Sequence, residues 1–133
     1  MYLQFRLPSS LMIMENLDFQ PSIIHKIYDF YKEMHKKIEK FPKTSRYSLG
    51  QKIENSILDL LETIYLANIQ IKTLREPVLH KASAKCELVK ILIRLAYDTG
   101  VIDNTSTYVS AQAKMQEIGK MLGGWIKYMR NAS

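Results

Sequence analysis

The stretch YVSAQAKMQEIGKMLGGWIKYM, residues 108–129, carries the strongest helical pattern in the chain. Its apolar side chains recur every three or four residues and occupy an arc of about 100° on a helical wheel. Lys120, Lys127 and Arg130 fall together on the far side of the same wheel. The apolar positions are Tyr108, Ala111, Met115, Ile118, Leu122, Trp125, Ile126 and Met129. This pattern predicts a long helix with one face buried against other helices.

Three earlier segments show the same periodicity, separated by the few glycines and prolines of the chain. We expect one helix from Pro21 to about Lys40, a second from Leu49 to about Arg75, and a third from Pro77 to a stop at Gly100. The expected inward residues are Ile24, Ile27, Tyr28, Tyr31, Met34 and Ile38, then Leu49, Ile53, Ile57, Leu60, Ile64, Ala67, Ile71 and Leu74, then Val78, Ala82, Cys86, Val89, Ile93 and Ala96. No segment alternates with the period of a strand. The sequence therefore predicts an all-α protein, an antiparallel up-down four-helix bundle.

The expected bundle comprises residues 18–133 as one domain, with Asp103 or Asn104 capping the fourth helix. Residues 1–17 contain a proline and a short apolar patch that is too brief for a secretory signal. We interpret them as a disordered leader, or as an extension upstream of a true start at Met12 or Met14.

The composition favours binding over chemistry. The 19 lysines and arginines against 13 aspartates and glutamates give a net charge of +6, which favours a polyanionic partner. Cys86 is the only cysteine, and His25, His35 and His80 lack the spacing of metal ligands. We expect no catalytic residues, no metal, no cofactor and no membrane span, and a cytoplasmic location. Cys86 falls among the inward residues, where a small buried hydrophobe is the default.

Apolar residues also recur on the outer sides of the second and third helices. They are Leu58, Tyr65 and Ile69 in the second helix, and Leu88, Ile91 and Leu95 in the third. Such a surplus can pack within the monomer or simply be tolerated at the surface. Because contiguous exposed apolar surface usually marks association, we expect these residues to form the interface of a closed homo-oligomer.

Three glycines of the last helix, Gly119, Gly123 and Gly124, lie outside any phosphate-binding glycine motif. They leave a smooth surface beside Trp125. We expect another helix to approach closely there.

Basic residues are clustered along the chain. Residues 32–52 carry a net charge of +5, residues 72–94 of +4 and residues 114–130 of +3, whereas residues 53–71 carry −3. A solvated face explains any one cluster, but three together favour nucleic acid. Lys90 and Arg94, one turn apart, suit adjacent phosphates in contacts that would depend on salt and not on base sequence. The full set of expected nucleic-acid contacts is Lys43, Arg46, Lys81, Lys85, Lys90, Arg94, Lys120, Lys127 and Arg130.

Three motifs occur in a fixed order along the chain: FPKTSRYSLGQ at residues 41–51, ILIRLA at 91–96 and EIGKMLGGWI at 117–126. Together with the basic bundle they resemble the accessory variability determinant, Avd, of diversity-generating retroelements, over residues 18–130. The protein encoded in intervening sequences of large ribosomal RNA genes shares the helix count and the style of the Phe-Pro turn, and is the alternative.

The resemblance implies a homopentameric barrel of four-helix bundles that binds RNA or DNA and the retroelement's reverse transcriptase during mutagenic copying of a template RNA. It also implies that basic residues of the third helix matter for these contacts, where Lys90 and Arg94 stand here. Lysine at position 90, where arginine also occurs in the family, keeps the charge but loses bidentate geometry. A purely protein-binding scaffold, whose charge serves solubility, is the alternative from another functional class.

Overall fold

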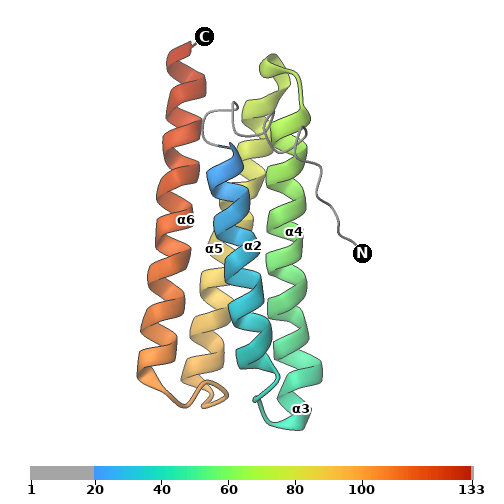
Figure 1. Cartoon of the computed structure of the whole chain (residues 1–133), viewed down its shortest axis with the longest axis vertical. Coiled ribbons are helices and arrows are strands. Elements are labelled where there is room, and N and C mark those ends of the chain that lie inside the picture. The colour runs from blue at the N-terminus through green and yellow to red at the C-terminus, as the bar shows by residue number, and fades with distance from the viewer. Residues whose placement is uncertain (1–19, 133) are drawn as a thin grey trace.

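The computed structural model describes residues 20–132, which form four long antiparallel helices and no strand (Figure 1). The long helices are α2 (Gln20–Ile38), α4 (Gln51–Ile69), α5 (Arg75–Asp98) and α6 (Thr105–Ala132). A short helix α3 (Lys43–Ser45) and a π-helical turn (Arg46–Gly50) lead into α4, and a 3-10 turn (Lys72–Leu74) leads into α5. The prediction of an all-α four-helix bundle is confirmed.

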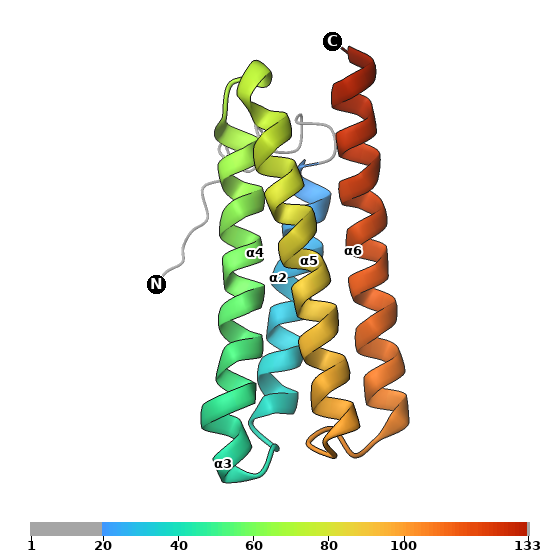
Figure 2. The ribbon, with the colours of Figure 1, turned by 180° about the vertical axis from the view of Figure 1, so that it is seen from behind.

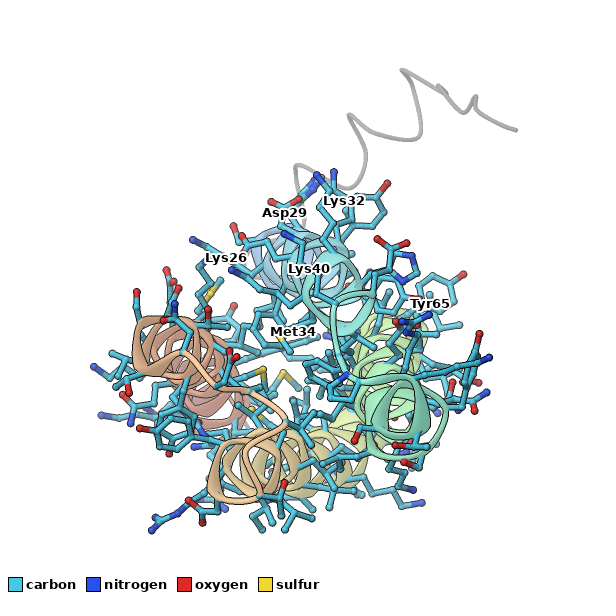
Figure 3. All side chains as sticks on the ribbon, turned by 90° about the horizontal axis from the view of Figure 1, so that it is seen from below. Lys26, Asp29, Lys32, Met34, Lys40 and Tyr65 are labelled. Atoms are coloured by element: carbon cyan, nitrogen blue, oxygen red, sulfur yellow. The ribbon has the colours of Figure 1, made fainter. Side chains whose placement is uncertain are left out.

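Neighbouring helices in the chain are neighbours in space. α4 packs between α2 and α5, and α6 packs between α5 and α2, so α2 lies diagonally opposite α5 (Figure 3). Seen from behind, α5 and α6 lie beside each other along the length of the bundle (Figure 2). This order places the outer side of α2 and the groove between α5 and α6 on separate sides of the molecule, with α6 between them.

The core is continuous from end to end, and every long helix contributes to it. Trp125 is fully buried, as are Ile57 and Ile64 of α4, Ile93 of α5 and Ile27 of α2. Removing an aliphatic or aromatic side chain of this size from water stabilises a fold by about 1.5–3 kcal/mol. Packing of these faces, more than helix propensity, holds the helices together.

The ends of α5 and α6 follow the expected turn chemistry. Gly100 adopts φ +82°, a conformation that costs glycine little, and ends α5 as predicted. Asn104 Oδ1 accepts a hydrogen bond from the Thr107 N–H at 3.2 Å and so caps the start of α6.

The predicted end of the second helix is wrong. α4 ends at Ile69, where Gln70 becomes extended, and α5 starts at Arg75. Ile71 and Leu74, expected in the core, are 62% and 53% exposed. The side chain of Arg75 explains the early stop, since its Nη2 donates to the carbonyls of Gln70 at 2.8 Å and Asn68 at 3.4 Å and satisfies the end of α4.

The expected inward face of α2 is correct at Ile27, Met34 and Ile38, which are buried, but not at its aromatic positions. Ile23 and Phe30 are buried, whereas Tyr28 is 53% exposed and Tyr31 is only partly buried. A buried tyrosine must find a partner for its hydroxyl, and Tyr31 finds one at the edge of the core in Glu54 Oε1 at 3.1 Å. Phenylalanine has no such need and takes the interior position.

The glycines of α6 do not support close helix packing within this chain. A Cβ atom at Gly123 or Gly124 would meet nothing within 4 Å, and one at Gly119 would meet only Cys86 Sγ at 3.7 Å. The expected close approach to Gly123 and Gly124 is therefore wrong for the bundle itself. By contrast, a Cβ at Gly50 would lie 2.8 Å from Ile38 Cγ2, so this glycine permits tight packing of the turn before α4.

The predictions for residues 1–17 lie outside the described residues. Among residues 20–132, none of the helices is both long and apolar enough to cross a membrane.

Candidate nucleic-acid interface

A groove runs between α5 and α6 on the outside of the bundle. At one end the rings of Tyr97 and Tyr108 stack with centroids 4.3 Å apart. Further along, Gln112 Nε2 donates to the carbonyl oxygen of Lys90 at 3.0 Å. These contacts hold the two helices in a fixed register, so side chains along the groove keep fixed spacings.

The groove contains two adjoining hollows that gather cationic side chains from both helices. The first, about 490 Å³, is lined by Lys90, Ile91 and Arg94 of α5 and by residues of α6. The second, about 390 Å³, is lined by Lys90 and by Lys120 of α6. Because Lys90 borders both hollows, Arg94, Lys90 and Lys120 line one continuous path.

Each α5 cation in the groove has an acidic neighbour on its own helix. Lys90 Nζ lies 2.7 Å from Glu87 Oε2, and Arg94 Nε lies 3.5 Å from Asp98 Oδ2. The side chain of Arg94 is 71% exposed, whereas that of Lys90 is 24% exposed. The exposed pair of Arg94 with Asp98 contributes about 0–1 kcal/mol, so a phosphate can replace the Asp98 carboxylate at little cost.

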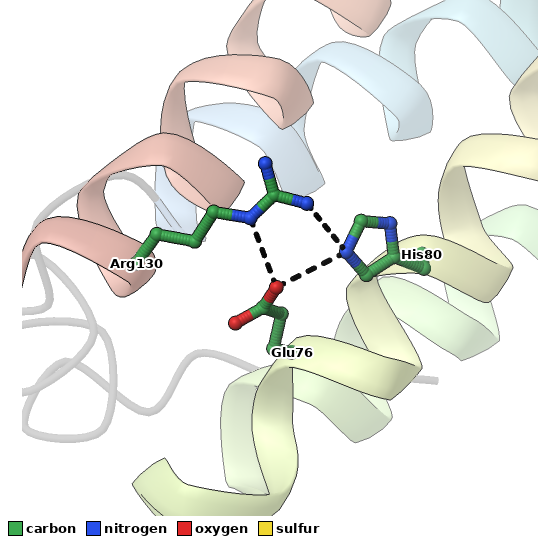
Figure 4. Close-up of polar contacts among 3 residues, drawn as sticks. All are labelled: Glu76, His80 and Arg130. Carbon is green, nitrogen blue, oxygen red and sulfur yellow. Dashed lines mark hydrogen bonds and ion pairs between the residues drawn. The ribbon is translucent and has the colours of Figure 1, made fainter. Parts of the chain in front are cut away.

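Arg130 is engaged within the protein (Figure 4). Its Nε donates to Glu76 Oε2 at 3.0 Å, and its Nη2 lies 3.3 Å from His80 Nε2. The pKa of Glu76 is lowered chiefly by the hydrogen bond from Arg130, and to a smaller extent by the one with His80. Lys127 is exposed one turn before Arg130 on the outer side of α6. Because Arg130 contacts Glu76 and His80, Lys127 is the residue of this pair that can extend the cationic path.

The remaining predicted contacts lie elsewhere. Lys85 Nζ lies 2.8 Å from Asp59 Oδ2 of α4, on the side of α5 away from α6, and Lys81 lies one turn before it. Lys43 and Arg46 belong to the turn between α2 and α4, where Arg46 Nη2 contacts the Phe41 carbonyl at 3.5 Å. The structure therefore brings together Lys90, Arg94 and Lys120, with Lys127 nearby, and leaves the other five outside the groove.

The site prediction did not include a row of lysines along α2 and the turn after it. Lys32 and Lys36 are exposed one helical turn apart on α2, and Lys40 is exposed in the turn that follows. The net charge of +5 over residues 32–52 was the signal that pointed to them.

The predicted interface residues form two separate surfaces. Glu54 of α4 contacts Tyr31 and His35 of α2, and Leu58, one turn further along, continues on that side. Tyr65 likewise projects from α4 on the side of α2 (Figure 3). We call the set Leu58, Tyr65 and Ile69 the α4 surface, and the set Leu88, Ile91 and Leu95 the α5 surface; all six are exposed.

The α5 surface lies beside the cationic groove and not beside the α4 surface. Asp59 and Lys85 mark the contact between α4 and α5, and Leu88 and Ile91 turn away from it. Ile91 borders the same hollow as Lys90 and Arg94.

Within residues 20–132 no cluster of three or more His, Cys, Asp or Glu side chains is placed to hold a metal ion. Burial raises the pKa of Cys86 to about 11, so its thiol is protonated near neutral pH.

Comparison with known proteins agrees with the sequence motifs. Neither curated proteins nor solved structures gave a match. One family model, described as bAvd-like, matches residues 22–129. This match covers α4, α5 and nearly all of α2 and α6, including the cationic groove. The chain therefore belongs to the bAvd-like family, the accessory variability determinants that its motifs resemble.

Proposed function

We propose that this protein is a non-catalytic accessory protein of a diversity-generating retroelement that holds RNA or cDNA beside the reverse transcriptase. The observation that carries the proposal is the cationic groove, in which Lys90, Arg94 and Lys120 line one path in a bAvd-like chain. Three cations along a groove match the repeating negative charge of a nucleic-acid backbone.

Binding in this groove is electrostatic and independent of base sequence. Lysine and arginine side chains that contact phosphates release condensed counterions, and this release supplies most of the affinity. The ion pairs of Lys90 with Glu87 and of Arg94 with Asp98 hold these cations in the groove until a phosphate replaces the carboxylates.

A salt series with a labelled RNA tests this proposal. The variant K90A/R94A should bind more weakly and show a shallower dependence of log K on log salt, by about 0.7 for each single-strand phosphate that the variant no longer neutralises. The matched control K52A/K72A removes the same charge from exposed positions outside the groove. Binding that ignores both salt and K90A/R94A would refute the role of the groove.

We also propose that the subunits close into a ring, a pentamer as the family resemblance implies. The α4 surface and the α5 surface are different, exposed and separately placed, which suits a head-to-tail contact in which one subunit's α4 surface packs on the next subunit's α5 surface. A two-fold dimer would instead use one surface twice.

Sedimentation and mixing test the ring. The purified protein should sediment as several subunits, and Y65E or L95E should each break the assembly. Because each variant keeps the surface that the other lacks, a mixture of Y65E and L95E should form heterodimers through one intact contact. A wild-type monomer at micromolar concentration, or a mixture that stays monomeric, would contradict head-to-tail assembly.

The exposed apolar surfaces also favour a second candidate, a scaffold that binds protein only. Copurification with the reverse transcriptase, combined with no RNA binding even at low salt, would support this candidate over the first.

A further inference from the structure

The outer side of α2 and the turn after it carry a row of cations. Lys32 and Lys36 are exposed and lie one helical turn, about 6 Å, apart along α2. Lys40 is exposed in the turn that follows the end of α2 at Ile38. Lys32 projects outward from α2, while Met34 points into the core (Figure 3). The row is therefore accessible along its full length in the described chain.

The lysines at and around the Lys40 end of the row have no acidic partner among residues 20–132. Neither Lys36 and Lys40 of the row nor their neighbours Lys37 and Lys43 make an ion pair within that range.

Two of the acids near the row face side chains outside it, and a third, Asp29, lies beside Lys32 at the Tyr28 end. Glu39 lies 3.6 Å from His35, and Glu33 pairs with Lys114 of α6. Asp29 is exposed one turn before Lys32 and Glu33. From Lys36 onward the surface is a concentrated positive field.

An aromatic ring stands at the other end of the row. Tyr28 is 53% exposed, and Lys32 Nζ lies over its ring at 5.1 Å from the centroid. An exposed aromatic side chain beside a line of cations is the arrangement by which proteins bind unpaired strands, because bases stack on the ring while phosphates follow the charges.

This surface is distinct from the α5–α6 groove, since α2 lies diagonally opposite α5. We propose that the outer side of α2, continued by the turn after it, is a second nucleic-acid surface, which binds a single strand of RNA or DNA lengthwise with phosphates on Lys32, Lys36 and Lys40 and a base on Tyr28. The proposal rests on the proposed function and extends it, because each subunit then holds two segments of nucleic acid on separate surfaces.

The test uses the full chain and a fluorescein-labelled single-stranded RNA, with a DNA strand of the same sequence and the corresponding duplexes as further arms. The variant K36Q/K40Q should weaken single-strand binding about tenfold at 0.1 M salt and lower the salt slope by about 1.4, the value for two phosphate contacts. Y28S should also weaken it, whereas Y28F, which keeps the ring, should not.

The matched control is K52Q/K72Q, which removes the same charge from exposed positions off both surfaces. Circular dichroism and the thermal midpoint check that each variant folds. Amine-reactive labelling of the wild type adds a measurement that needs no variant, since bound RNA should protect Lys36 and Lys40 but leave Lys52 and Lys72 reactive.

The outcomes separate the two proposals. If the wild type binds no nucleic acid at low salt, both proposals fail. Suppose that the wild type binds and that K90A/R94A weakens this binding. If K36Q/K40Q then leaves the affinity, the salt slope and the protection of lysines unchanged, only the α2 surface is overturned. Equal binding of duplex and single strand, with Y28S without effect, would overturn the single-strand assignment.

Discussion

Arg130 Nε donates a hydrogen bond to Glu76 Oε2 at 3.0 Å, joining the last turns of α6 to the first turn of α5 across 54 residues of sequence. His80 Nε2 lies 3.2 Å from the same carboxylate oxygen, so the three side chains form one polar cluster (Figure 4). The cluster ties α6 to α5 at the end of the bundle where α5 begins and α6 ends.

The first prediction concerns the pH dependence of this cluster. The pKa of Glu76 is below its ordinary value, chiefly through Arg130, so the charged form is favoured in the folded state. Its contribution to stability is present above the unfolded-state pKa and is lost as the pH falls through the lower folded-state value. E76Q should therefore lower the thermal midpoint slightly at pH 7 and show a shrinking difference from wild type below about pH 4. If the difference in thermal midpoint between E76Q and the wild type stayed constant down to about pH 2, the lowered pKa of Glu76 would be contradicted.

The second prediction concerns Cys86. With a pKa of about 11, the buried thiol is almost entirely protonated at pH 8, with roughly one molecule in a thousand as thiolate. Iodoacetamide should modify native protein very slowly at pH 8 and unfolded protein quickly. The rate is measured by mass spectrometry with and without denaturant. Equal rates in the two conditions would show that Cys86 is accessible.

The third prediction contrasts two isoleucines near the end of α4. I64A should lower the free energy of unfolding by about 2–5 kcal/mol, because Ile64 is fully buried and its removal leaves a cavity. I71A should change it by about 0.5 kcal/mol or less, because Ile71 is 62% exposed. Denaturant unfolding, followed by fluorescence of the buried Trp125, measures both. A large destabilisation in I71A would place Ile71 in an interaction that the single chain does not contain.

The fourth prediction contrasts two glycines. G123A should raise the free energy of unfolding by about 0.5–1 kcal/mol, because Gly123 lies within α6 with nothing near a new Cβ. G50A should lower it, because the Cβ would lie 2.8 Å from Ile38 Cγ2 and 3.2 Å from the Ser45 carbonyl oxygen. Thermal unfolding distinguishes the two. If G123A instead weakened self-association, another subunit would approach this face of α6.

Part of the candidate site followed from spacing along one helix. Lys90 and Arg94 are four residues apart and had to share a side of α5. That Lys120 borders the same groove depends on the packing and register of α5 against α6. No sequence spacing predicts such a pairing, because it joins residues from two helices.

Local pattern determined the helices, their order and most of the core, because an amphipathic period of about 3.6 residues is a property of the chain itself. The end of α5 at Gly100 and the cap of α6 at Asn104 could also be predicted from the sequence, since each depends on backbone chemistry within a few residues. Tertiary structure decided where α4 ends, which aromatic side chain of α2 is buried and which cations remain available. Arg75 ends α4 by reaching carbonyls that precede it, and Arg130 is held by Glu76 on another helix. These outcomes depend on distances between separate elements, and only the packed bundle sets those distances.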